Sequence, residues 1–308
     1  MRTHHASSGR AGFTLVELLI AMTVGLVVLA AATGLVASTW RGMSGNRERE
    51  GIERNARFIN EALMRDLSET GVGISSSVRF GTLSARGDTI VILSVPYTNN
   101  VPASPHTIQY AGPALAPATG TCGTYCVDVD TVGFDIAIGD LALLQSSNER
   151  RLIQVTNVTR TGSKASVTFS PDSTLLQHEG AYARNLQLSS TSTVIMKLKF
   201  VEYYVQNQRL MRAERLNADR TPAGELIATG VDSIKVNLVF TNGNLAPTAD
   251  PTDASGENDW NDIMATRVFA TLQSDPTDIR LNGGLPVTRN YQWWFAPRNL
   301  KYEKNRVS

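Results

Sequence analysis

The amino-acid sequence predicts an α+β protein in which one long N-terminal helix packs on an antiparallel, β-rich head. Three observations lead to this prediction. Residues 13–40 are almost wholly apolar, residues 41–73 carry an apolar stripe with helical spacing, and residues 74–308 consist of short β-type runs between turn residues. A helix and a sheet that each have one apolar face can bury both faces by packing together.

Residues 1–12 form a short basic leader. This segment contains Arg2 and Arg10, has no acidic residue, and ends in the small residues Ala11 and Gly12. In an ordinary secretory signal the small-residue cleavage site follows the apolar core, whereas here it precedes the apolar segment. Cleavage after Gly12 would therefore remove the leader and leave the apolar segment on the mature chain.

Residues 13–40 are long enough to cross a membrane as a helix. At about 1.5 Å per residue the segment spans roughly 42 Å, more than the roughly 30 Å of a bilayer's hydrocarbon core. Its only charged side chain is Glu17. An acidic side chain in a membrane span is costly and usually has a partner.

Cleavage after Gly12 would create a partner for this carboxylate. Phe13 would then carry a free α-amino group that is largely protonated at neutral pH, about one helical turn from Glu17. In a filament, the amine of one subunit can meet the Glu17 carboxylate of its neighbour. That pairing would neutralise two poorly solvated charges and fix the axial register between subunits.

Residues 12–20, Gly-Phe-Thr-Leu-Val-Glu-Leu-Leu-Ile, resemble the class III signal of type IV prepilins and type II secretion pseudopilins. In that family a membrane aspartic peptidase, the prepilin peptidase, cleaves after the glycine and methylates the new N-terminal phenylalanine. The resemblance implies that Gly12 precedes the scissile bond and that Phe13 is the methylated mature N-terminus. It also implies that Glu17, the fifth mature residue, docks one subunit on another.

The helix is predicted to continue beyond the apolar segment, over residues 14–70 and a length on the order of 85 Å. Gly71 and Gly73 supply the stop. The opposite face of this second half has acidic and basic residues at i,i+4 spacing, including Glu53 and Arg57. The apolar stripe, with spacings of three and four, comprises Ile52, Ala56, Ile59, Leu63 and Leu67.

The head is expected to be mainly antiparallel sheet laid against the apolar stripe of the helix. Residues Gln206 to Gln208 are predicted to form the turn of a hairpin. Trp293 and Trp294 are expected in the core, since aromatic residues in a terminal strand are more often buried, and an exposed docking patch is the alternative. The predicted strands are Thr89–Val95, Asp140–Gln145, Leu152–Val158, Ala165–Phe169, Thr193–Val205, Leu210–Glu214, Ser233–Phe240, Ala265–Gln273 and Tyr291–Phe295.

The two cysteines, Cys122 and Cys126, are separated by three residues. Without a second cysteine pair or a His-x-x-x-His motif, this spacing makes a poor zinc site. A head outside the cytoplasm would favour a local disulfide. Such a bond closes a very short loop and adds little stability through chain entropy. Free thiols are the alternative.

Residues 250–262 form a loop rich in acidic side chains. Their spacing does not fit the EF-hand template, which needs glycine at its sixth position. We therefore expect a solvated loop without a metal, and calcium binding is the alternative.

Nothing in the sequence predicts an enzyme. The mature chain would retain only two histidines, His106 and His178, and has no His-Glu-x-x-His, Gly-x-Ser-x-Gly or Walker motif. No cofactor is expected. The 29 Lys and Arg residues balance the 28 Asp and Glu residues, which gives no electrostatic reason to expect nucleic acid as a partner.

Several stretches of the head also resemble the PilW branch of minor pilins: residues 139–144 with 151–156, 201–205 with 209–212, 228–236, and 265–268. This resemblance implies a minor pilin that helps to prime assembly of type IV pili and enters the filament at or near its tip. The implied partners are other minor pilins, the major pilin, the prepilin peptidase and the inner-membrane assembly platform.

The resemblance further implies a single-pass protein of the inner membrane with its head in the periplasm, which is later found in the pilus at the cell surface. The tip-most subunit of the family commonly lacks the fifth-position glutamate, so Glu17 implies that another subunit sits above this one. Two alternatives remain. One is a J-type minor pseudopilin of a type II secretion system, and the other is a tip subunit that binds a surface or takes up DNA.

Overall fold

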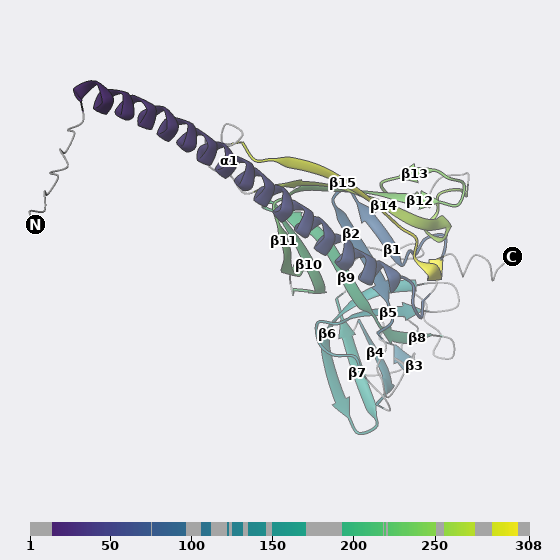
Figure 1. Cartoon of the computed structure of the whole chain (residues 1–308). Coiled ribbons are helices and arrows are strands. Elements are labelled where there is room, and N and C mark those ends of the chain that lie inside the picture. Colours follow the sequence, from purple (N-terminus) through teal and green to yellow (C-terminus); the bar gives the residue numbers. More distant parts are fainter. Residues whose placement is uncertain are drawn as a thin grey trace, which may run out of the picture. The chain divides into compact units, whose positions relative to one another are not determined.

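The computed structural model (Figure 1) confirms the α+β class, with one long helix followed by antiparallel strands. It describes residues 14–74, 76–96, 106–111, 122, 125–131, 135–145, 150–170, 193–217, 219, 221–250, 256–274 and 285–300. The chain divides into two compact units. One comprises residues 1–51 with 275–287, and the other comprises residues 52–274 with 288–308.

Helix α1 (Leu15–Ser68) ends close to the predicted boundary. The five residues of the predicted stripe, from Ile52 to Leu67, are all buried. After the helix, Gly71 and Gly73 adopt φ angles of 72° and 77°, a region that disfavours residues with a side chain. The amide of Gly71 then donates to the carbonyl of Leu93, which joins the helix end to the first sheet.

The first sheet has five antiparallel strands in the order β1-β2-β9-β10-β11. The predicted hairpin is confirmed, because β9 and β10 pair with Gln206 opposite Arg209. Asn207 and Gln208 at its tip have φ angles of 51° and 59°, as a tight two-residue turn requires. The strands are β1 (Leu83–Arg86), β2 (Thr89–Ser94), β9 (Lys199–Gln206), β10 (Arg209–Leu216) and β11 (Pro222–Thr229).

The second sheet has four strands in the order β13-β12-β14-β15. Alternate residues of β14 are buried, which shows that one face of this sheet packs on the core and the other faces solvent. The strands are β12 (Val231–Phe240), β13 (Leu245–Ala246), β14 (Ile263–Gln273) and β15 (Thr288–Phe295), with a short 3-10 turn, η1 (Trp260–Asp262), before β14.

A closed barrel lies in sequence between β2 and β9, two strands that are neighbours in the first sheet. The sequence did not separate this barrel from the rest of the head. Its strands, in the spatial order β3-β4-β7-β6-β5-β8, are β3 (His106–Ala111), β4 (Cys126–Asp130), β5 (Leu141–Gln145), β6 (Arg150–Thr161), β7 (Lys164–Phe169) and β8 (Val194–Lys197).

The predicted strand Thr193–Val205 is wrong as a single element. It divides at Leu198 into β8 of the barrel and β9 of the first sheet. Neighbouring residues are buried along both β5 and β8, so these strands lack the alternation that would mark the division. In β5, Ala142 and Leu144 point into the barrel core, whereas Leu143 packs with Phe200 in a second cluster that joins the barrel to the first sheet.

Candidate functional site

The N-terminal end of α1 is held by a reciprocal pair of side-chain bonds. Glu17 donates its backbone amide to Thr14 Oγ1 at 3.3 Å. In return, Thr14 donates its own amide and its hydroxyl to Glu17 Oε2, each at 3.0 Å. This is a capping box, in which a Thr and the Glu three residues later satisfy otherwise unpaired amides of the first turn. Gly12 and Phe13, the residues of the predicted cleavage site, lie outside the described residues.

The cap leaves Glu17 able to make a further bond. Both bonds that its carboxylate accepts from Thr14 end on Oε2. A carboxylate has about four acceptor positions on its two oxygens, so Oε1 can receive another donor. The first turn of a helix is also where the helix dipole favours negative charge. The same side chain can therefore cap its own helix and accept a positive group from outside.

The first half of α1 is exposed in the part of the chain that the structure describes. The helix is long and apolar enough to span a membrane, and none of its most apolar stretch is buried. Side chains such as Leu15, Leu26 and Val27 are more than 60% exposed. Burying one Leu, Val or Ile side chain gains roughly 1.5–3 kcal/mol. This surface is suited to lipid or to the apolar helices of other subunits.

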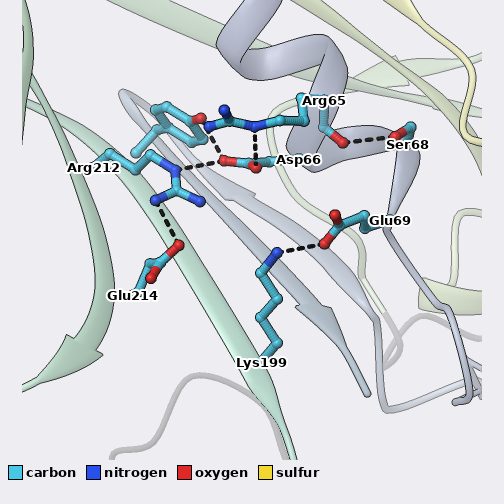
Figure 2. Close-up of polar contacts among 8 residues, drawn as sticks. Arg65, Asp66, Ser68, Glu69, Lys199, Arg212 and Glu214 are labelled. Carbon is cyan, nitrogen blue, oxygen red and sulfur yellow. Dashed lines mark hydrogen bonds and ion pairs between the residues drawn. The ribbon is translucent and has the colours of Figure 1, made fainter. Parts of the chain in front are cut away.

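The second half of α1 is fixed to the first sheet by a buried carboxylate, Asp66, which is 1% exposed. Tyr203 of β9 donates its hydroxyl to Asp66 Oδ2 at 2.6 Å. Arg212 of β10 donates from Nε to the same oxygen at 2.6 Å, and Arg65 donates to Oδ1 at 3.3 Å. Figure 2 shows Asp66 between the two arginines, one from the helix and one from the sheet. Because Tyr203 and Arg212 are direct cross-strand partners, the pairing of β9 with β10 brings both donors to one point.

The charge of Asp66 is stabilised in this position. Burial alone would raise the pKa of Asp66, but hydrogen bonds from Arg212 and Tyr203 and the two guanidinium charges outweigh burial and hold the pKa below its ordinary value of 3.8. The stability that Asp66 contributes is therefore present above that value and is lost as the pH falls through the lower folded-state pKa. Burial and the nearby Asp66 raise the pKa of Tyr203, so its hydroxyl remains a donor.

Other polar contacts surround this buried site but are more exposed. Lys199 of β9 pairs with Glu69 at 2.5 Å, and Arg212 also pairs with Glu214 at 2.7 Å (Figure 2). Exposed ion pairs contribute only about 0–1 kcal/mol each. Further contacts join the helix to other elements: Asn55 with the Thr229 carbonyl, Glu53 with Arg289, and the Thr70 carbonyl with Asn299. The i,i+4 spacing along the helix predicts Arg57 as the partner of Glu53, whereas in the structure Glu53 pairs with Arg289.

The role of Asp66 was not predicted from the sequence, although a signal was present. Asp66 follows Leu63 by three residues and so falls on the apolar stripe of the helix. A charged residue on a stripe that is otherwise buried needs a buried partner. That partner came from the sheet and could not be identified from helical spacing.

A second carboxylate, Glu202, lies next to Tyr203 on the opposite face of β9. It is partly buried, and burial raises its pKa from the ordinary value of 4.5 to about 6. No hydrogen bond or ion pair to Glu202 is present among the described residues. Glu202 therefore opposes folding once it is ionised.

The remaining candidate residues have no common site in the described part of the chain. Cys122 and Cys126 form a disulfide at the start of β4. Among the described residues no group of three or more His, Cys, Asp or Glu side chains is placed to hold a metal ion, and residues 251–255 of the acidic loop lie outside them. His106 lies in β3, and His178 also lies outside the described residues.

The expectation that both tryptophans lie in the core is wrong for Trp294, which is 55% exposed. The alternation of side chains along β15 turns the two residues to opposite faces. Trp293 is partly buried and stacks on Tyr291 with ring centroids 5.8 Å apart.

Comparison with known proteins identifies the N-terminal segment. A family model described as "Prokaryotic N-terminal methylation motif" matches residues 7–33. This range includes Gly12, Phe13 and Glu17. No curated protein matches the chain.

The first prediction concerns the buried ion pair. Asp66→Asn keeps the size of the side chain but removes the charge that Arg212 needs. We expect the free energy of unfolding to fall by about 3–5 kcal/mol, the usual cost of removing one partner of a buried pair. Urea denaturation of the full chain in detergent, followed by tryptophan fluorescence, measures this change.

Glu69→Gln is the matched control for Asp66→Asn. It removes a neighbouring carboxylate whose pair with Lys199 is partly exposed, and it should cost less than about 1 kcal/mol. Equal losses in the two variants would contradict a dominant role for Asp66.

The second prediction concerns pH. Because the folded-state pKa of Glu202 is raised to about 6, the unfolded chain loses this proton first, and the fold is progressively destabilised as the pH rises from 4.5 to about 6. Glu202→Gln should therefore raise the free energy of unfolding by about 1–2 kcal/mol at pH 7.5 and leave it nearly unchanged at pH 4. Urea denaturation at the two pH values measures the effect. A gain of the same size at both values would refute the assignment.

Proposed function

We propose that this chain is a type IV pilin-like subunit and, within that class, a minor pilin of the PilW type that helps to prime pilus assembly and enters the filament at or near its tip. The observation that carries the pilin-like part of this proposal is the methylation motif at residues 7–33, and the narrower assignment is supported by the resemblance of the head to the PilW branch. This motif supports a pilin-like or pseudopilin role in pilus or secretion assembly and implies processing by a prepilin peptidase.

The apolar first half of α1 supports a filament role. Its exposed side chains fit membrane anchoring before assembly, with the β-rich unit outside the bilayer. In the proposed filament the same side chains pack against the apolar helices of neighbouring subunits. Because their burial in either environment is favourable, the helix can pass from lipid to filament without exposure to water.

Glu17 gives the proposed assembly its register. Its carboxylate already caps the first turn through Oε2, and Oε1 remains for the methylated amine of Phe13 in a neighbouring subunit. A charge pair in an apolar surrounding penalises any shift that separates the partners, because each charge would then be unpaired. Lateral packing of apolar side chains alone would fix the axial position much less strongly.

The head supplies recognition in this proposal, and the chain is not an enzyme. The proposed partners are other minor pilins, the major pilin and the inner-membrane assembly platform, with the head in the periplasm before assembly and on the pilus afterwards. The buried pair at Asp66 supports this role, because it fixes the second half of the helix to the first sheet of the head.

Deletion of the gene tests the proposed role. Loss of surface pili, counted by electron microscopy and restored by the intact gene, is the expected result. Normal piliation with loss of type II secretion would contradict the pilus role and would favour a minor pseudopilin.

The third prediction separates the two tasks of Glu17. Glu17→Gln retains a residue that completes a capping box but removes the charge, whereas Glu17→Ala removes both. We expect both variants to be cleaved normally, as gel mobility shows, and both to be depleted from sheared filaments at least tenfold, as immunoblotting shows.

Glu50→Ala is the control for these variants, since it removes an exposed acid from the same helix outside the apolar half. It should incorporate like the wild type. Wild-type incorporation of Glu17→Gln would show that the charge of this carboxylate is not used in docking.

A further inference from the structure

The solvent-facing side of the second sheet carries an ordered set of polar and aromatic side chains. We call it the outer face, and it consists of the outward residues of β12, β14 and β15. These residues form three rows of cross-strand partners, each given in the order β12, β14, β15. The rows are Asn237, Arg267 and Trp294; Lys235, Phe269 and Gln292; and Ser233, Thr271 and Asn290. The residues that alternate with them in β14, such as Val268 and Ala270, are buried, so the two faces of the sheet are distinct.

Arg267 is fixed at one end of this outer face. Its guanidinium carbon lies 4.5 Å from the ring centroid of Phe269 and 5.0 Å from that of Trp294. Its Nη2 donates to Gln292 Oε1 at 2.7 Å. Contacts of this kind hold a planar cation in one place, so little conformational freedom is lost when it binds an anion.

Trp294 provides an open aromatic surface beside this cation. Its side chain is 55% exposed even though it contacts Arg267. An exposed indole can stack on the apolar C–H face of a sugar ring, and its N–H can donate a hydrogen bond. A fixed arginine and an open indole therefore lie side by side.

The charge of the outer face favours an anionic ligand. Lys235 is exposed and lies on β12, the strand next to that of Arg267, two residues from Asn237, which is the cross-strand partner of Arg267. The outer face as defined includes no carboxylate. Asp232 lies in the irregular start of β12, beyond Ser233. Two cations are few for nucleic acid, which binds through many phosphate contacts. The expected ligand is therefore an anion with widely spaced charges.

The other groups of the outer face suit a ligand rich in hydroxyls. Asn237, Asn290 and Gln292 present amides that can both donate and accept hydrogen bonds. Thr271 donates to Asn290 Oδ1 at 3.0 Å, which leaves the amide nitrogen of Asn290 for a ligand. A protein interface would instead present a cluster of aromatic or apolar anchors at its centre, whereas the outer face as defined has two aromatic residues, Phe269 and Trp294, among polar side chains.

We propose that the outer face binds an acidic polysaccharide, with Trp294 stacked on a sugar ring, Arg267 and Lys235 paired with uronate carboxylates, and the amides bonded to hydroxyls. Arginine pairs well with carboxylates because its parallel N–H groups match their two oxygens. This binding role is independent of the proposed role in pilus priming, since it uses no residue of the helix.

The fourth prediction tests this site with the full chain in a non-ionic detergent at low salt. Polygalacturonate is the acidic glycan, dextran the neutral glycan and polyglutamate the acidic polymer without sugar, and a double-stranded oligonucleotide represents nucleic acid. Calorimetric titration should give saturable binding to polygalacturonate at least tenfold tighter than to the other three, and this binding should weaken with added salt. Equal binding to polyglutamate, the oligonucleotide or dextran, or no binding to polygalacturonate, would overturn the proposal.

Matched variants locate the binding. Trp294→Ala and Lys235→Glu should each weaken polygalacturonate binding at least tenfold. Leu226→Ala removes another exposed apolar side chain, and Lys164→Glu makes the same charge change in the barrel. Both controls should stay within twofold of the wild type, and all four variants should unfold at the wild-type temperature. An equal loss in Lys235→Glu and Lys164→Glu would show that net charge, and not the outer face, determines binding.

Discussion

The apolar first half of α1 sets the main constraint on this protein, because among the described residues none of its most apolar stretch is buried. Contact of such side chains with water is unfavourable. Burial of each one stabilises the protein by roughly 1.5–3 kcal/mol. A favourable environment for this stretch is lipid or the apolar surface of other helices. In the proposed function, lipid covers the stretch before assembly and the apolar helices of other subunits cover it in the filament. Glu17 is the single carboxylate of this stretch. Because a charge in an apolar environment is costly and usually has a partner, Glu17 is expected to have one.

The two ends of the helix use buried or capped carboxylates for different purposes. At the first turn, Glu17 makes a local cap with Thr14 and keeps one oxygen for an external donor. In the last turns, Asp66 has both oxygens occupied by donors from its own chain. The first arrangement is open to another subunit, whereas the second is complete and fixes the helix to β9 and β10. If Glu17 docks neighbouring subunits as proposed, its free carboxylate oxygen serves assembly, whereas the fully bonded carboxylate of Asp66 serves the fold of the subunit itself.

The sequence was sufficient to predict the features that depend on local pattern. The extent of α1, its buried stripe and the β9–β10 hairpin follow from helical spacing, from Gly71 and Gly73, and from the turn at Asn207 and Gln208. The features that depend on contacts distant in sequence were missed. Strand β11 is one example. It begins at Pro222 and contains Gly224, and these two residue types argue against a strand unless it lies at the edge of a sheet. In the structure β11 is such an edge strand.

Burial on two faces explains why the barrel was not predicted. Residues Leu141 to Leu144 are apolar without interruption, because alternate side chains enter two different cores. Period-two patterning cannot separate two such cores. For the candidate sites, Thr14 with Glu17 matched a capping box that was not considered, and Asp66 needed partners that only the fold brings together. Strand alternation places Trp293 and Trp294 on opposite faces of β15. The exposure of Trp294 could therefore be predicted only if Trp293 was already known to face inward.

The most direct test of the docking account is the chemical identity of the mature N-terminus. Mass spectrometry of the chain purified from cells that contain the prepilin peptidase, with sequencing of the N-terminal fragment, measures it. The account predicts a chain that begins at Phe13 with one methyl group on its amine, one helical turn from Glu17. A mature chain that begins at any other residue would contradict it, because the positive group that Glu17 is proposed to accept would then be in the wrong place.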